Sequence, residues 1–374
     1  MKFNVSSTLL FQQLQAISRV LVSKSSMPVL ECILFDLEGE TLTLTATDTE
    51  TTIRTTISVE NAEGAGKVAF EAKLLLDTLK ELPEQPVTFN VNDMSFGLNI
   101  TTANGNYSFI GRNGMEYPEM QQLEDEHKHF AIESHTLLDA INKTIFCTAD
   151  DELRPVMNGI NFDLAENHIT LVATDAHRLV RYINKTITVP EAASFILPKK
   201  PANILRSILA KEESSVNVYF GQKNVMFEFG KTLIMARLIE GRYPNYNGVI
   251  PQNNTNIIIV DRATILNACK RVAVFANNSS ALLKLIISEN QINISAQDID
   301  FSTSAEETIA CSYAGDTINI GFKAPFLIEL LAAIESNDVE FRLADAARAG
   351  LIMPTEQAEN EEVLMLLMPM LLND

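Results

Sequence analysis

The chain has 374 residues, of which 46% are hydrophobic and 21% are charged, and its formal net charge is −19. This composition excludes a disordered protein and supplies enough apolar residues for two or three domain cores. The longest apolar run, residues 363–372, is too short to span a membrane and contains Pro369. The opening residues, Met1-Lys2-Phe3-Asn4-Val5, lack an apolar signal region. We therefore expect neither a membrane protein nor a secreted one.

Four cysteines lie far apart in the sequence, at Cys32, Cys147, Cys269 and Cys311. Without a Cys-x-x-Cys pair or a Cys/His cluster, the sequence predicts no zinc site, no other metal site and no disulfide framework, which fits a reduced cytoplasm. The chain has 48 acidic residues against 29 basic ones. Taken alone, this excess predicts repulsion from nucleic acid.

Three landmarks recur in one order with a period of about 125 residues, which indicates an internal repeat. An alternating apolar and polar segment ends at Asp48, Asp175 and Asp298. A lysine follows 25 residues later, at Lys73, Lys200 and Lys323. Each unit closes with Tyr117-Pro118, Tyr243-Pro244 or Met368-Pro369. The repeat predicts three domains, spanning residues 1–125, 126–250 and 251–374.

Polar stretches separate the units. The first, residues 124–129, contains His127 and His129, which we interpret as part of a solvated linker rather than as a metal site.

In chain order, apolar residues at helical spacing predict six helices, at 10–24, 73–82, 137–145, 199–211, 262–271 and 323–335. Alternating residues predict strands, among them 42–48, 169–175, 216–220, 292–298 and 317–320. Two helices and many antiparallel strands in each unit indicate an α+β fold. Each unit could itself be a duplicated half, which would give six similar substructures.

Two possible catalytic motifs are weak. The segment 64–69 contains Gly-Lys, but it leads into a strand and no Ser or Thr follows the lysine. Asp175 and His177 would point to one face of a strand and could form an acid–base pair. No nucleophile motif accompanies them, so a catalytic pair is the less favoured interpretation.

Two segments occur in one unit only and are candidates for function. The second unit alone continues its aspartate with Ala176-His177-Arg178-Leu179, and the third alone ends in the methionine-rich tail 363–372. The tail has two interpretations that the sequence leaves open. It is either a buried edge strand or part of an adaptable groove for partner peptides.

The predicted helices differ in charge from the rest of the chain. Together the six segments carry a net charge of +8, so the remainder carries −27. If the helices line one surface, that surface could hold the phosphates of duplex DNA without reading sequence.

The combination of these features resembles the bacterial DNA sliding clamp, the beta subunit of DNA polymerase III. The resemblance rests on the three-fold repeat, the opening Met1-Lys2-Phe3, the blocks 173–179 and 240–246, and the terminal Met368-Pro369-Met370. It implies a head-to-tail homodimer whose six domains form a ring around double-stranded DNA. Such a ring is not an enzyme and needs no cofactor. It tethers the replicative polymerase alpha subunit, and it binds a clamp loader, other polymerases and repair proteins through short peptides.

The resemblance also implies three sets of site residues. The peptide-binding pocket would comprise Arg154, Met157, Thr174, His177, Arg178, Leu179, Pro244, Val249, Phe326, Met368, Pro369 and Met370. The DNA-binding residues would be Lys24, Lys73, Arg154, Lys199, Lys200, Lys270 and Arg271. The dimer interface would include Tyr107, Val274 and Phe275. Departures from the family pattern are Ala176 and Gly248, where glycine and arginine are common, and Phe326, where tyrosine is common.

Two other functions remain open at this point. One is a protein-interaction module with no DNA partner, which would leave the basic helices unexplained. The other is an enzyme that uses Asp175 and His177.

Overall fold

The structure is a computed structural model that describes residues 1–22, 24 and 26–372. The described residues divide into two compact units. Unit 1 comprises Met1–Leu137 and Asn203–Leu238, and unit 2 comprises the remaining described residues. Each unit therefore contains one terminal sequence repeat and part of the central repeat.

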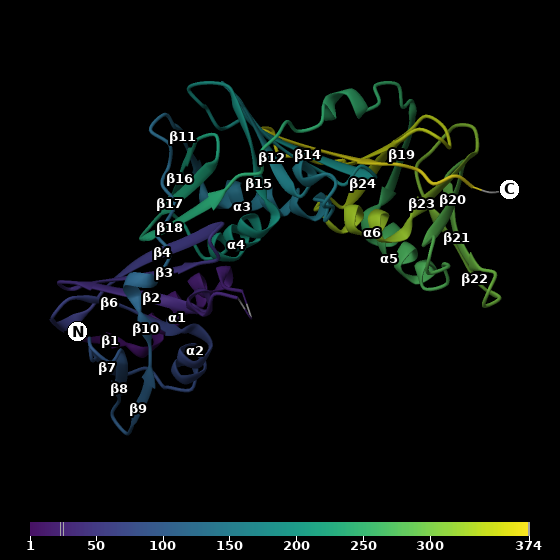
Figure 1. Cartoon of the computed structure of the whole chain (residues 1–374). Helices are drawn as coiled ribbons and strands as arrows, with labels where there is room; N and C mark the ends of the chain where they lie inside the picture. The colour runs from purple at the N-terminus through teal and green to yellow at the C-terminus, as the bar shows by residue number, and fades with distance from the viewer. Residues whose placement is uncertain (23, 25, 373–374) are drawn as a thin grey trace. The chain divides into compact units, whose positions relative to one another are not determined.

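The described residues form six α-helices, as the sequence predicts, together with antiparallel sheets (Figure 1). The helices are α1 (Ser7–Ile17), α2 (Ala72–Lys80), α3 (Ser134–Asn142), α4 (Lys199–Leu209), α5 (Arg262–Ala273) and α6 (Ala324–Ala332). The α+β prediction is confirmed. No helix among the described residues is long and apolar enough to cross a membrane.

Unit 1 contains two sheets. In spatial order the first has β5 (Glu60–Glu63), β1 (Lys2–Ser6), β7 (Pro86–Val91), β8 (Gly97–Thr101) and β9 (Asn106–Ile110). The second has β10 (Arg112–Asn113), β6 (Gly66–Glu71), β2 (Cys32–Glu38), β3 (Thr41–Thr47), β4 (Thr51–Ser58), β18 (Thr232–Arg237), β17 (Asn224–Phe229), β16 (Ser215–Phe220) and β11 (Lys128–Glu133). The β4–β18 pair joins strands of the first and second repeats into one sheet.

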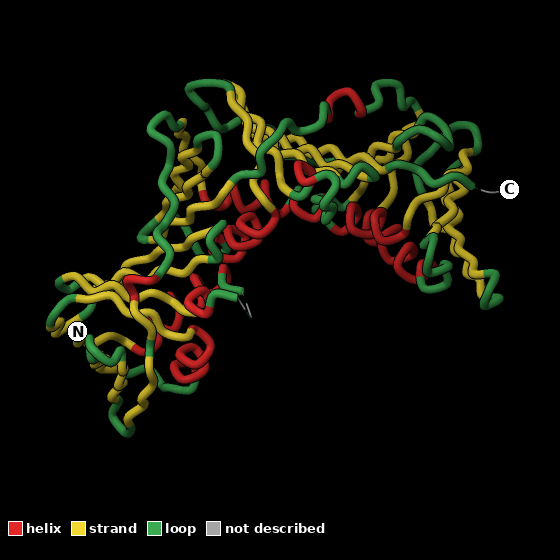
Figure 2. Tube along the Cα trace, in the orientation of Figure 1, coloured by secondary structure: helices red, strands yellow, loops and turns green. Residues whose placement is uncertain are grey.

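Unit 2 also contains two sheets. The larger has β15 (Ala193–Pro198), β12 (Gly159–Ala165), β13 (His168–Thr174), β14 (Arg178–Asn184), β26 (Glu361–Leu367), β25 (Gly350–Pro354), β24 (Asp338–Leu343) and β19 (Asn256–Asp261). The smaller has β22 (Thr303–Ala310), β21 (Gln291–Asp298), β20 (Leu282–Ser288) and β23 (Ile318–Lys323). Figure 2 shows α5 and α6 along one face of these strands.

One pattern occurs six times along the chain: a strand runs directly into a helix, and at least three strands follow. The first strand of each pattern pairs with the other half of its repeat, as β1 does with β7 and β6 does with β2. Each repeat therefore consists of two similar halves, as the sequence suggested. Apolar side chains at alternate strand positions face the core, where Phe3, Phe35 and Phe89 stack.

Capping residues fix where helices begin. The Ser6 hydroxyl accepts the Leu9 N–H at 3.0 Å, and the Asp261 carboxylate accepts the Thr264 N–H at 2.7 Å. The prediction of a first helix over 10–24 is wrong at its end, because α1 stops at Ile17. Residues 18–20 tighten into a 3₁₀ turn, and the Leu21 N–H closes onto the Ser18 carbonyl at 3.1 Å. Lys24 thus lies outside the helix.

The repeated aspartates shape turns. Asp48 Oδ1 accepts the backbone N–H groups of Glu50 and Thr51, at 3.0 and 2.6 Å. Asp175 and Asp298 accept the equivalent pairs of N–H groups in their own repeats. The landmark that reveals the repeat is therefore a turn-forming residue.

The cysteines and histidines play structural parts. All four cysteines are free, and burial raises the pKa of the Cys32, Cys147 and Cys269 thiols, which makes them poor nucleophiles.

The linker interpretation of His129 is wrong, because this residue lies in β11 and its ring stacks on Tyr219 at 4.5 Å. Pairing of β11 with β16 brings the two rings to one face of the sheet.

We predict that Asp48→Ala lowers the free energy of unfolding by about 1–2 kcal/mol, because two turn N–H groups lose their acceptor. Urea-induced unfolding of the full chain measures this loss. As the control, Glu38→Ala changes an exposed carboxylate at the end of β2 and should shift the free energy by less than about 0.5 kcal/mol. Equal effects of the two substitutions would contradict the turn-forming role.

Candidate functional site

The unit-specific turn of the second repeat, residues 174–178, is held by its own side chains. The Thr174 hydroxyl donates to the Arg178 carbonyl at 2.7 Å and accepts the Ala176 N–H at 3.1 Å. Asp175 Oδ1 accepts the N–H groups of His177 and Arg178, both at 2.9 Å. Ala176 has a φ of 74°, a left-handed conformation that favours glycine. The turn therefore presents His177 outward and directs Arg178 inward.

Arg178 is the best-connected residue of the site and is only 6% exposed. Its Nε donates to Asp175 at 3.0 Å, Nη1 to Glu329 at 2.6 Å, and Nη2 to the Phe146 carbonyl at 2.8 Å. Its guanidinium also lies over the Phe326 ring, 4.5 Å from the centroid. A buried cation is tolerated when it is paired and hydrogen-bonded in this way.

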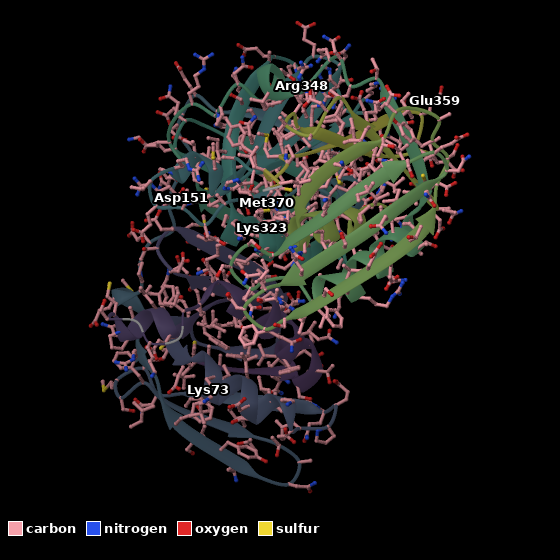
Figure 3. All side chains as sticks on the ribbon, turned by 90° about the vertical axis from the view of Figure 1, so that its right-hand side faces the viewer. Lys73, Asp151, Lys323, Arg348, Glu359 and Met370 are labelled. Atoms are coloured by element: carbon pink, nitrogen blue, oxygen red, sulfur yellow. The ribbon has the colours of Figure 1, made fainter. Side chains whose placement is uncertain are left out.

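The methionine-rich tail of the third repeat packs against this turn. Strand β26 pairs with β14 so that Leu367 lies opposite Arg178. Beyond the strand, the Met368 N–H donates to the His177 carbonyl at 2.8 Å, and the Met370 N–H donates to the Gly321 carbonyl at 2.8 Å. Figure 3 shows Met370 beside Lys323, at the start of α6. The interpretation of the tail as a buried strand is confirmed for 361–367, but this strand lies inside a sheet and not at its edge, while 368–370 continues along the turn.

The structure divides the expected peptide-site residues into two layers. Thr174, Arg178 and Leu179 are buried, and Leu179 packs in a core cluster with Ile250 and Leu366. His177, Val249 (58% exposed) and Met368 (43% exposed) reach the surface, while Pro244, Phe326, Pro369 and Met370 are half-buried. The outer layer is apolar around one imidazole, and the buried layer positions it.

Two basic residues lie around Phe326. Lys323 Nζ lies 4.9 Å from the centroid of the Phe326 ring, and the guanidinium carbon of Arg178 lies 4.5 Å from it. The His177 ring stacks on Phe326 with the two centroids 6.0 Å apart. Sequence reasoning missed Phe146, Glu329 and Lys323 as partners at this site. Phe146 comes from a distant segment. Lys323 and Glu329 lie three residues before and three residues after Phe326, a helical spacing that could have identified them.

Arg154 and Met157 belong to a short 3₁₀ segment, with Met157 half-buried. Arg154 Nε donates to Asp151 Oδ2 at 2.8 Å, and its side chain is 44% exposed (Asp151 is labelled in Figure 3). Among the described residues, no hydrogen bond or ion pair joins Arg154 to the turn or to the tail, so it lies at the margin of the set.

The acid–base interpretation of Asp175 and His177 is wrong in its geometry. Asp175 lies beyond the end of β13 rather than on a strand, and its carboxylate accepts the His177 backbone N–H and Arg178, not the imidazole. Among the described residues, no group of three or more His, Cys, Asp or Glu side chains is arranged to hold a metal ion.

The expected DNA-binding residues lie in several environments. Lys73 and Lys270 are exposed on α2 and α5. Lys199 forms an ion pair with Asp150 at 2.6 Å, and Arg271 makes two hydrogen bonds to Glu307, at 2.8 and 2.7 Å. Lys200 is half-buried at the start of α4, and Lys24 follows the first helix with a φ of 70°.

The expected dimer residues belong to two apolar surfaces. Tyr107 (38% exposed) lies on β9, the last strand of its sheet, as does Ile110 (81% exposed). Val274 (79%) and Phe275 (40%) follow α5, which packs against β21 and β22. The β21–β22 turn adds exposed Ile299 and Phe301. Sequence reasoning missed Ile110, Ile299 and Phe301, because apolar residues in strands and turns are ordinarily buried.

Comparison with known proteins gives consistent matches along the chain. Models of the DNA polymerase III beta subunit match residues 1–121 (N-terminal domain), 131–245 (central domain) and 247–371 (C-terminal domain). The beta sliding clamp of Haemophilus influenzae is 28% identical over 368 residues, which cover 98% of this chain and 99% of that protein. That of Pseudomonas aeruginosa is 26% identical over 371 residues, covering 99% and 100%.

Solved structures of sliding clamps also match the chain over its full length. A Pseudomonas aeruginosa DNA polymerase sliding clamp, crystallised with a ligand, has a TM-score of 0.93 and 25% identity, with both chains fully covered. A Bartonella birtlesii sliding clamp bound to griselimycin has a TM-score of 0.92 and 26% identity, again with full coverage.

We predict that Arg178→Lys lowers the free energy of unfolding by about 2–3 kcal/mol, because an ammonium group cannot reach three acceptors in the planar geometry of the guanidinium. The matched change at its neighbour, His177→Ala, should alter the free energy by less than about 0.5 kcal/mol, because that side chain is exposed. Urea-induced unfolding of both variants tests the division into layers. If His177→Ala proved the more destabilising change, the division would be wrong.

Proposed function

Because this chain belongs to the family of the DNA polymerase III beta subunit, the beta sliding clamp, we propose that two copies close head to tail into a ring around duplex DNA. Family membership confirms the resemblance found in the sequence. The chain is a sliding clamp, a non-catalytic processivity subunit of a DNA polymerase, and this excludes the enzyme hypothesis.

The observation that carries the ring proposal is the way third strands pair. In each strand–helix–three-strand pattern the third strand lies outermost, and two such pairs, β4–β18 and β14–β26, join patterns within the chain. The remaining third strands, β9 and β22, each end a sheet. By the same antiparallel pairing, β9 of one copy can meet β22 of another. A heterologous contact of this kind generates a ring when its rotation closes.

Apolar side chains beside both edge strands support this pairing. Tyr107 and Ile110 accompany β9, while Val274, Phe275 and Phe301 accompany β22. Their exposure in a single copy is the pattern expected of an interface that a second copy covers.

DNA retention in such a ring is topological. A closed ring cannot leave the duplex sideways, so weak contacts between basic side chains and phosphates suffice and sliding remains possible. We assign these contacts to the basic residues named from the sequence. Because Lys199, Arg154 and Arg271 already have carboxylate partners, each would contribute less free charge than Lys73 or Lys270.

The outer layer around His177 and the tail is proposed as the site for short partner peptides. Flexible methionines beside Phe326 and His177 offer an adaptable apolar surface. The proposed partners are the polymerase alpha subunit, the clamp loader, and other polymerases and repair proteins. Tethering raises the effective concentration of the polymerase at the primer end, which gives processivity without catalysis.

The proposal includes three clamp domains at 1–125, 126–250 and 251–374, and a cytoplasmic location. The three family matches, which begin at residues 1, 131 and 247, support the division.

We predict that Val274→Asp and Ile110→Asp each raise the dissociation constant of the dimer at least ten-fold, because a buried carboxylate would lack a partner at the interface. Sedimentation equilibrium measures the constant. Leu153→Asp is the control, since Leu153 is 91% exposed but belongs to neither edge strand. A dimer unaffected by both interface variants would refute the assignment.

Removal of residues 368–374 should abolish binding of a fluorescein-labelled peptide from a polymerase alpha subunit, while the dimer survives. The deletion removes Met368, Pro369 and Met370 but ends after β26. His177→Ala should weaken binding in fluorescence anisotropy, whereas the control His129→Ala, on β11, should not. Unchanged affinity after the deletion would contradict the peptide site.

Reversing Lys199 and Lys200 to Glu should slow loading onto circular DNA and leave peptide affinity unchanged, because charge repulsion would act on phosphates only. The same double reversal at Lys185 and Lys223, which are exposed on or beside strands, keeps the total charge equal and should have little effect. Loading at the wild-type rate would remove Lys199 and Lys200 from the DNA-binding set.

A further inference from the structure

The first repeat contains a cavity of about 340 Å³ whose lining shares no residue with the sites described above. It opens on one face of strands β2, β3, β4 and β6, beneath the segment that follows β10. The residues that matter for its chemistry are Leu34, Arg54, Lys67, Met115, Glu119 and Met120. Its volume is within the range of sites for small ligands and for two or three peptide side chains.

Arg54 is the unusual member of this cavity. Its Nε is buried without a hydrogen-bond partner, and no ion pair of its guanidinium occurs among the described residues. Lys67, by contrast, pairs with Asp36 at 2.9 Å. An arginine whose buried Nε lacks an acceptor is costly in an isolated protein, and a ligand carboxylate would relieve that cost.

In the second repeat the equivalent arginine has a counterion, although its own Nε is likewise buried without a hydrogen-bond partner. In the strand registers, Arg54 lies opposite Thr45 as Arg181 lies opposite Val172, which makes the two arginines equivalent. Arg181 forms an ion pair with Glu362, on the neighbouring third strand β26. Glu362 lies opposite Ile183, two residues after Arg181. In the first repeat the residue opposite Thr56, two residues after Arg54, is Lys231, whose carbonyl accepts the Thr56 N–H. The first repeat thus places a cation where the second has the counterion.

The space is also filled differently in the two repeats. Counting from the equivalent Tyr117 and Tyr243, Met120 takes the place of Tyr246. The Tyr246 hydroxyl donates to Asp163 at 2.7 Å, and its ring packs against the core cluster beneath. Met120 instead lines the open cavity, beside Met115, which is 78% exposed.

We propose that this cavity is a second binding site, specific for an acidic peptide segment of a partner protein. The guanidinium of Arg54 would bind an Asp or Glu carboxylate, and Met115, Met120 and Leu34 would contact an adjacent apolar side chain. Lys67 is paired with Asp36, and Glu119 forms no ion pair among the described residues. A peptide can offer backbone N–H groups to it, which a free carboxylic acid cannot.

The test uses the full chain with ¹³C-methyl-labelled methionine, titrated with capped tetrapeptides that carry Asp or Glu beside Leu, Met or Phe. Binding should shift the Met115 and Met120 methyl signals saturably, and the matching Asn or Gln peptides should bind at least ten-fold more weakly. The Met368 and Met370 signals report separately on the proposed peptide site.

Three variants check the mechanism. Arg54→Gln and Lys231→Glu should each weaken binding at least ten-fold, the first by removing the cation and the second by supplying it with a counterion. Met120→Tyr should abolish binding by filling the cavity as Tyr246 does in the second repeat. Lys231→Glu changes an exposed side chain, so it keeps the test decisive if Arg54→Gln fails to fold.

The proposal is overturned if no peptide of the panel shifts the Met115 and Met120 signals at millimolar concentration. It is also overturned if shifts occur only at Met368 and Met370, or if Lys231→Glu and Met120→Tyr bind as tightly as the wild type.

Discussion

The structure depends on antiparallel pairing between third strands of its repeated pattern. The β4–β18 and β14–β26 pairs turn three sequence repeats into continuous sheets, so the compact units differ from the repeats themselves. Backbone hydrogen bonds supply this pairing, and they do not depend on side-chain identity. The third strands β9 and β22 have no neighbour on one side, so each is the edge of its sheet. An edge strand with unpaired backbone groups and exposed apolar neighbours is suited to pair with another chain. Ring closure therefore extends a contact that the chain already makes twice.

The proposed peptide site lies where the repeats differ. The Asp-capped turn is common to all three, but only in the second does it hold an arginine that Glu329, Asp175 and the Phe146 carbonyl bind together. The guanidinium of that arginine lies against the Phe326 ring, and the tail of the third repeat packs along the turn. In the first repeat, Arg54 lacks such partners and borders a cavity. One scaffold thus gives different surfaces through a few substitutions.

Much of the fold could be predicted from the sequence because the repeat is regular and the six helices and Asp-ended strands have clear periodicity. The end of α1 could not, since no Gly or Pro marks Ile17. The candidate site was reached mainly through the family resemblance. Its two layers were not predictable, because the burial of Arg178 follows from Phe146 and Glu329, which lie in distant segments of the chain. The cavity at Arg54 was also missed, since an unpaired arginine leaves no pattern in the sequence.

The most direct test of ring closure is negative-stain electron microscopy of the purified full chain over a range of concentrations. Ring closure predicts particles with a central hole, whose mass of about 83 kDa is twice the 41.4 kDa of one chain. Particles that remain single chains without a hole at every concentration would contradict the pairing of β9 with β22 between copies.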